Sequence, residues 1–225
     1  MSTVSPPRIV VLVSGEGSNF EAIAEAIERG DVVGRIVAVI SNRPQARALA
    51  RAGRHGLPTE VVDHTAYSGR EAFDTALAMR IDAHGPDLVV LAGFMRILTP
   101  SFVDHYLGRM LNIHPSLLPA YPGLDTHARV LADGMARHGA SVHFVTRELD
   151  GGPVVLQGAV RIGIDDTPAR LAKRVQVIEH RLYPQAVAWF TSGRLHLSGH
   201  RAILDGIPLD TPRQLDPSTE EASPP

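Results

Sequence analysis

Continuous apolar runs recur along the chain and alternate with segments of helical character. Residues 9–13, 36–40 and 88–92 contain no polar side chain, a pattern typical of strands that are buried on both faces of a parallel sheet. Segments of more mixed composition predict four further strands, at residues 59–62, 109–113, 140–145 and 154–161. Helices are predicted between the strands, with a short one after Thr99 and longer ones at residues 20–29, 45–55, 68–85, 126–137 and 167–189.

The order of these elements predicts the fold class. Strand and helix alternate, which favours a right-handed, doubly wound, mostly parallel α/β sheet in a single domain. Ser68 and Glu71 have the spacing of a capping box at the start of a helix. A small hairpin is predicted at residues 194–204. We expect one domain over 8–206, a disordered segment at 1–7, and a flexible, proline-rich tail at 207–225.

Composition narrows the function classes. The chain has 225 residues, of which 44% are hydrophobic and 20% charged, and its net charge is −2. This near-neutral balance gives no electrostatic footprint for nucleic acid or an anionic membrane. With no cysteine, the chain can form neither disulfides nor thiolate metal sites. No histidine pair combines metal-ligand spacing with a nearby carboxylate, so we expect no metal. The absence of any long apolar run predicts no membrane span and a cytoplasmic location.

A glycine-containing turn follows the first predicted strand. Gly15 and Gly17 would let the backbone approach a ligand, and the next helix would present free N–H groups to a phosphate. A full dinucleotide fingerprint needs a third glycine, but the chain has Phe20 there. It also needs an acid after the second strand, where the sequence reads Ser-Asn-Arg. NAD is therefore disfavoured, whereas Arg43 leaves NADP open.

The segment Asn112-Ile113-His114-Pro115-Ser116-Leu117-Leu118-Pro119 carries the most chemically informative motif. Side chains alternate along a strand, so Asn112 and His114 should point the same way and Ile113 into the core. The prolines stiffen the chain that follows. An amide beside an imidazole can hold a carbonyl oxygen while negative charge builds on it. The same residues would also suit a strand end whose polar groups bond only to the backbone.

This motif, followed by Tyr121-Pro122-Gly123, resembles the signature of the folate-dependent formyltransferases. Within that group the chain resembles the phosphoribosylglycinamide formyltransferases of purine synthesis, from about Ile9 to Gly206. The resemblance implies a Rossmann-like formyltransferase fold. It also implies 10-formyltetrahydrofolate as the formyl donor, with glycinamide ribonucleotide as the acceptor.

The resemblance also implies roles for particular residues. The catalytic set would be Asn112, His114 and Asp150, with the Asp150 carboxylate orienting the imidazole and favouring its charged form. The substrate's phosphate would be bound by Gly17, Ser18 and Asn19, and the rest of that substrate by Gln176 and Glu179. The folate would be bound by Arg70, Met95, Arg96, Ile97, Leu98, Asn112, Thr146 and Asp150.

Several alternatives remain open from the sequence. Asp150 could simply begin an Asp-Gly-Gly turn. A methionyl-tRNA formyltransferase would be expected to carry a further C-terminal domain and a basic surface. A formyltetrahydrofolate hydrolase would be expected to carry an N-terminal regulatory domain, whereas residue 9 already starts the first predicted strand. A non-catalytic nucleotide-binding module is the alternative from another class. The sequence leaves the oligomeric state open, including a homodimer.

Overall fold

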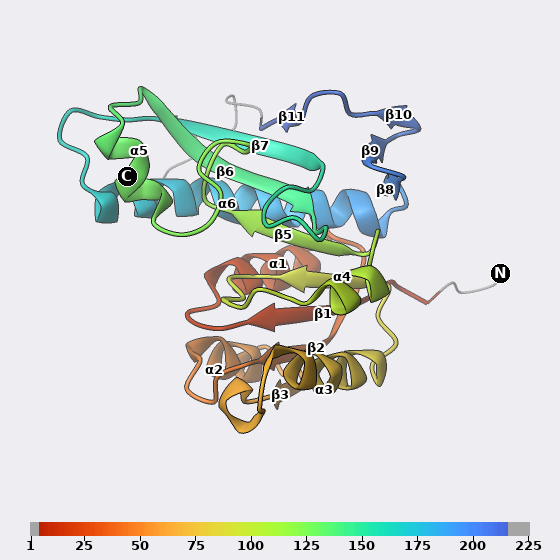
Figure 1. Ribbon diagram of the computed structural model, residues 1–225. Coiled ribbons are helices and arrows are strands. Elements are labelled where there is room, and N and C mark those ends of the chain that lie inside the picture. Colours follow the sequence, from red (N-terminus) through yellow and green to blue (C-terminus); the bar gives the residue numbers. More distant parts are fainter. Residues whose placement is uncertain (1–4, 216–225) are drawn as a thin grey trace.

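The computed structural model describes residues 5–215, so most of the predicted N-terminal segment and the last ten residues lie outside it. An eight-stranded sheet has the order β11-β7-β6-β5-β4-β1-β2-β3, and helices cover both faces (Figure 1). A separate three-stranded sheet has the order β10-β9-β8. The strands are β1 (Arg8–Val13), β2 (Arg35–Ser41), β3 (Thr59–Val61), β4 (Leu88–Leu91), β5 (Met110–His114), β6 (Arg137–Phe144), β7 (Val154–Arg161), β8 (Leu195–Ser198), β9 (Arg201–Leu204), β10 (Ile207–Pro208) and β11 (Arg213–Gln214). The α-helices are α1 (Ser18–Glu28), α2 (Arg47–Arg54), α3 (Arg70–Asp82), α4 (Pro100–His105), α5 (Thr126–Ala132) and α6 (Pro168–Thr191), with a 3₁₀ turn at His64–Ala66.

The large sheet has a parallel part and an antiparallel part. Strands β3, β2, β1, β4 and β5 run parallel. β6 then pairs antiparallel with β5, and β7 antiparallel with β6. This confirms the predicted doubly wound, mostly parallel α/β sheet. It also puts a change of strand direction between β5 and β6, beside the Asn112–His114 motif.

Alternating side chains of β1, the middle strand of the five parallel ones, pack into two different layers of the core. Ile9 and Val11 of β1 pack in the layer that includes buried residues of α1 and α6. Val10 and Leu12 pack in the layer with α3 and α4. All four are fully buried. The uninterrupted apolar run of β1 therefore exists because both faces of this strand are covered.

The 24-residue helix α6 spans the parallel and antiparallel parts of the sheet. Thr167 caps it by accepting a hydrogen bond from the Arg170 backbone, and Pro168 occupies its first turn. Tyr183, fully buried, donates its hydroxyl toward the carbonyls of Leu91 and Leu111 at 3.0 and 2.9 Å. The helix thus ties together the ends of β4 and β5. Near its C-terminus, Trp189 packs against the core.

Two predicted boundaries were wrong. The helix predicted at 126–137 ends at Ala132, and Arg137 already belongs to β6, where it pairs with Arg161. Gly134 adopts a left-handed conformation, with φ of 64°, just after the helix. The predicted capping box at Ser68 does not form. Helix α3 begins at Arg70, its N-cap is Gly69, and no side chain caps it.

The C-terminal tail also differs from the expectation over its described part. Residues 207–208 form β10 against the β8–β9 hairpin, and 213–214 form β11 beside β7. The backbone N–H of Leu215 donates to Gln157 O at 2.7 Å, and both Leu209 and Leu215 pack against the core. Apolar residues within a polar segment hold this part of the tail on the domain. Residues 216–225 lie outside the described part of the chain.

Candidate active site

Asn112 and His114 lie at the carboxyl end of β5, where the direction of the sheet changes. Asn112 is paired with Leu91 of β4 on one side and with His143 of β6 on the other. His114 is only 6% exposed. Its Nε2–H donates to the Tyr121 carbonyl at 2.9 Å, so Nδ1 is the nitrogen that faces the site.

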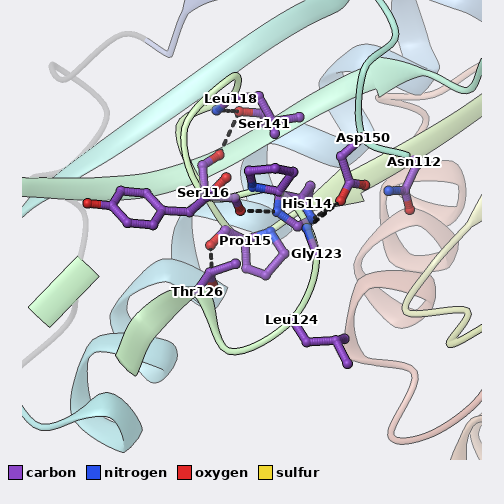
Figure 2. Close-up of polar contacts among 12 residues, drawn as sticks. Asn112, His114, Pro115, Ser116, Leu118, Gly123, Leu124, Thr126, Ser141 and Asp150 are labelled. Carbon is purple, nitrogen blue, oxygen red and sulfur yellow. Dashed lines mark hydrogen bonds and ion pairs between the residues drawn. The ribbon is translucent and has the colours of Figure 1, made fainter. Parts of the chain in front are cut away.

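Asp150 returns to this strand end from the turn after β6. Its Oδ2 lies 3.4 Å from His114 Nδ1 and accepts a hydrogen bond from the Gly123 backbone at 2.8 Å (Figure 2). Asp150 has a φ of 52°, a left-handed conformation that aspartate tolerates better than most residues. A Cβ at Gly152 would lie 1.8 Å from the Phe144 carbonyl oxygen, so the turn requires glycine there. The Asp-Gly-Gly turn is therefore real, and it brings the carboxylate to the histidine.

His143 is a member of this cluster that the sequence interpretation missed. It is 2% exposed, and its Nδ1–H donates to the Phe144 carbonyl at 2.9 Å. Its Nε2 then accepts from the Asn112 amide at 3.1 Å and lies 3.7 Å from Asp150 Oδ1. Burial lowers the pKa of His143, which favours this neutral form. The position of His143 directly opposite Asn112 was the available signal, but it depends on the β5–β6 register.

Side chains of β6, β7 and the first turn of α5 hold the backbone of the loop between β5 and α5. Ser141 Oγ donates to the Ser116 carbonyl at 2.6 Å and accepts from the Leu118 N–H at 3.0 Å (Figure 2). Gln157 donates to the Leu118 carbonyl at 2.8 Å. Thr126 Oγ1 donates to the Pro115 carbonyl at 2.7 Å. The prolines alone do not fix this loop, because side-chain hydrogen bonds anchor its backbone at several points.

A cavity of about 250 Å³ lies over the glycine turn between β1 and α1. Ser18 Oγ accepts a hydrogen bond from Gln176 at 2.9 Å, and Asn19 Nδ2 donates to Glu179 at 2.7 Å. The residues predicted to bind phosphate therefore touch those predicted to bind the rest of the substrate. Burial raises the pKa of Glu179, and the hydrogen bond from Asn19 opposes this shift. Gly17 has a φ of 75°, and a Cβ there would lie 2.4 Å from the Ala48 Cβ.

A second cavity of about 120 Å³ is lined by Asn112, His143 and Asp150 of the polar cluster. Apolar and polar side chains of the segment after β4 form one wall, and the turn after β6 forms the other. The predicted folate residues that line it are Arg96, Ile97, Leu98, Asn112, Thr146 and Asp150.

Two predicted folate residues lie elsewhere. Met95, 61% exposed, lines the glycine-turn cavity instead. Arg70 is exposed at the start of α3 and lines neither cavity.

A larger cavity, of about 590 Å³, lies between α1 and α6 and is lined by Arg29, His180 and Trp189 among others. It contains none of the predicted site residues, so volume alone does not mark the reactive centre. Within residues 5–215, no group of three or more histidine or acidic side chains is arranged to hold a metal ion. No helix in that range is long and apolar enough to cross a membrane.

An open sheet with cavities and a polar cluster at the carboxyl ends of its parallel strands is the arrangement of Rossmann-like α/β enzymes. The chain belongs to the formyl transferase family, whose model matches residues 7–187. This confirms the resemblance seen in the Asn112–Pro119 motif.

Individual relatives narrow the comparison. The phosphoribosylglycinamide formyltransferase of Escherichia coli K12 is 52% identical over 199 residues, which cover 88% of this chain and 94% of that protein. The trifunctional purine biosynthetic protein adenosine-3 of Homo sapiens is 41% identical over 87% of this chain, but over only 19% of its own length. The solved structure of the Coxiella burnetii phosphoribosylglycinamide formyltransferase has a TM-score of 0.90 and 47% identity, and covers 94% of this chain and all of that one.

Proposed function

We propose that this protein transfers the formyl group of 10-formyltetrahydrofolate to the amine of 5′-phosphoribosylglycinamide. The products are N-formyl glycinamide ribonucleotide and tetrahydrofolate, in purine biosynthesis. The observation that carries the proposal is the cluster of Asn112, His114 and Asp150, of which Asn112 and Asp150 line the second, partly apolar cavity. The segment after β4 joins this cavity to the one at the N-terminus of α1, because its residues line both. The relatives are named phosphoribosylglycinamide formyltransferases, and this name supports the acceptor and the group transferred.

The glycine-turn cavity suits the phosphate and the glycinamide. The first turn of α1 offers free backbone N–H groups, and Ser18 and Asn19 line the cavity beside them. Asn19 Oδ1 is buried without a hydrogen-bond partner among the described residues, so it can accept from a substrate N–H or hydroxyl. Glu179, which accepts a hydrogen bond from Asn19, adds a carboxylate directly behind the residues that line the cavity.

The second cavity suits the folate. Phe94, Ile97 and Leu98 offer apolar surface to the pterin ring, while Thr146 offers a hydroxyl. Arg96 adds a positive charge on the same wall, which suits the carboxylates of the folate's glutamate. Asn112 and Asp150 line this cavity too, so the formyl group can be placed directly over the polar cluster.

The chemistry follows from this arrangement. The substrate amine attacks the formyl carbon, and a tetrahedral oxyanion forms. Asn112 gives one amide hydrogen to His143 and has a second for the oxyanion. His114 faces acceptors at both ring nitrogens, so the imidazolium satisfies both. Its 3.4 Å separation from Asp150 is longer than a charge-assisted hydrogen bond, which leaves the Nδ1 proton available to the oxyanion.

Asp150 stabilises the imidazolium and orders a water that carries the proton from the amine to the folate nitrogen. Collapse of the oxyanion then breaks the bond between the formyl carbon and that nitrogen, which releases tetrahydrofolate. No covalent intermediate with the protein is required. Holding both substrates against one cluster makes the reaction effectively intramolecular, which is a large part of the acceleration.

A turnover assay with and without glycinamide ribonucleotide tests the proposal. We expect tetrahydrofolate to form only when the acceptor is present, and Asp150→Asn to lower kcat by about 10²-fold or more. Asp205→Asn is a matched control, because Asp205 pairs with Arg194 in the β8–β9 hairpin. Folate turnover without the acceptor would indicate a hydrolase. Binding without turnover would indicate a nucleotide-binding module.

A further inference from the structure

The segment that follows β4 forms one wall of the folate cavity, yet residues 94–99 belong to no helix or strand. A segment without a regular hydrogen-bond ladder must be positioned by other contacts. Two buried polar side chains supply such contacts, one near each end of the segment. Neither of them lines the folate cavity.

Ser14 holds the first end. It follows β1, is 4% exposed, and its Oγ accepts a hydrogen bond from the Met95 backbone at 2.8 Å. The same hydroxyl donates to Asn42 Oδ1 at 2.6 Å. Asn42 is fully buried after β2 and contacts His64 in turn. This chain of bonds crosses from the ends of β1 and β2 to the segment.

Asp74 holds the second end. It lies on α3, is 3% exposed, and its Oδ2 accepts from the Thr99 backbone at 2.6 Å. Thr99 is itself the N-cap of α4. A buried carboxylate is costly unless its charge is compensated. Burial raises the pKa of Asp74, while the bonds from Thr99 and the positive charge of Arg96 oppose that rise.

Arg96 connects this second end to the cavity. Its guanidinium lies 5.3 Å from the ring centroid of Phe73, the residue next to Asp74. Its Nε is buried without a hydrogen-bond partner among the described residues. The ring contact thus places the Arg96 guanidinium against α3, beside the helical turn that carries Asp74.

We propose that Asp74 and Ser14 are positioning residues that clamp the segment 95–99, so that Arg96, Ile97 and Leu98 form the folate wall. This inference rests on the proposed function, because it assigns that wall to the folate. The two residues differ in whether they line a cavity themselves. Asp74 lines neither cavity, whereas Ser14 also lines the glycine-turn cavity. Loss of Asp74 should affect the folate alone, and loss of Ser14 should affect both ligands.

The test measures KM for each substrate and the Kd of tetrahydrofolate by calorimetry. Asp74→Ala should raise the KM and Kd of the folate roughly 10- to 100-fold, because a displacement of about 1 Å is enough to cost that much. The KM for glycinamide ribonucleotide should stay within about twofold. Asp74→Asn keeps an acceptor for Thr99 but removes the charge near Arg96, so it should recover part of the loss. Ser14→Ala should raise both KM values.

Asp82→Asn is the control. Asp82 lies on the same helix and accepts from the Tyr106 hydroxyl at 2.9 Å, so it joins α3 to α4 without touching the segment. We expect it to change the melting temperature without changing the KM for the folate. The proposal is overturned if this control raises that KM as much as Asp74→Ala does. It is also overturned if Asp74→Ala leaves folate affinity unchanged, or if both Asp74 variants weaken the binding of the two substrates equally.

Failure of the proposed function would look different. The native protein would then bind tetrahydrofolate or glycinamide ribonucleotide without transferring a formyl group. The tetrahydrofolate Kd of the Asp74 variants would still decide whether Asp74 positions the folate wall, and a native protein with no folate affinity would overturn both ideas.

Discussion

The parallel and antiparallel parts of the sheet contribute to the site in different ways. In the parallel part the strand interiors of β1 and β4 are wholly apolar, and polar groups lie in the turns that follow the strands. In the antiparallel part, buried polar residues lie within the strands themselves: His138, Ser141, His143 and Gln157. The turns that line the cavity at β1 are thus built locally, whereas the contacts of Asn112 depend on how β5 and β6 pair.

The largest expected effect comes from the junction of the two parts. His114→Ala should lower kcat about 10³-fold, or by about 4 kcal/mol, since the imidazolium acts when the oxyanion forms. Both ligands should keep their Kd within a few-fold, because His114 lines neither of the two cavities. Calorimetry with each ligand, beside steady-state kinetics, checks this. Loss of both ligands with the imidazole would make His114 a binding or structural residue.

A change of pH should act on the antiparallel part. Burial, with the nearby charges of His127 and His114, lowers the pKa of His138 to about 4. The unfolded chain takes up this proton near pH 6.5 and the folded chain does not. The free energy of unfolding should therefore fall as the pH drops from about 6.5 to 4, by at most about 3 kcal/mol.

Urea unfolding at pH 7.5, 5.5 and 4.5 measures this slope. His138→Gln should flatten it, although His127 and His143, whose pKa values are also lowered by burial, contribute in the same direction. An unchanged slope in the variant would show that His138 does not couple folding to pH.

Substitutions at Gly15 and Gly17 should distinguish an effect on ligand binding from an effect on packing in the parallel part. Gly15→Ala places a methyl group where nothing lies within 4 Å, beside the cavity, so folding should be kept. The KM for glycinamide ribonucleotide should rise about 10-fold, or about 1.4 kcal/mol, with folate affinity unchanged. Gly17→Ala should also destabilise the fold by about 1–3 kcal/mol, because its Cβ would overlap Ala48. Equal behaviour of the two variants in a thermal melt would contradict this distinction.

The smallest expected effect concerns the outer edge of the antiparallel part. A chain ending at residue 208 lacks β11, Leu209 and Leu215, whereas one ending at 215 keeps them. The shorter chain should lose about 1 kcal/mol, or about 2–4 °C in Tm, because two partly buried leucines and one short strand are removed. Its kcat should match that of the longer chain. Identical melting temperatures would restore the prediction of a flexible tail for this segment.

The same division explains which features the sequence could predict. The uninterrupted apolar runs of β1, β2 and β4 located those strands to within one or two residues. The start of β6 was missed because Arg137, His138 and Gly139 carry no apolar signal, and it is their pairing with β7 that makes them a strand. Local pattern is sufficient where both faces of a strand are buried against helices.

The candidate site shows the same limit. Asn112 and His114 share a face of one strand, and this follows from alternation. Their contact with Asp150, far along the chain, came from the family resemblance and not from spacing. His143, Ser14 and Asp74 act across elements distant in sequence, and no local pattern marked them. Contacts of this kind depend on tertiary packing.

The chain has one tryptophan, and its location gives a practical optical readout. Trp189 lines the space between α1 and α6 beside Arg29 and His180, and it lines neither of the two ligand cavities. Its indole emission therefore reports on the docking of α6 against the sheet and not on occupancy of the reactive centre. Unfolding of the domain can be followed by intrinsic fluorescence while the pterin's own absorbance reports on folate binding.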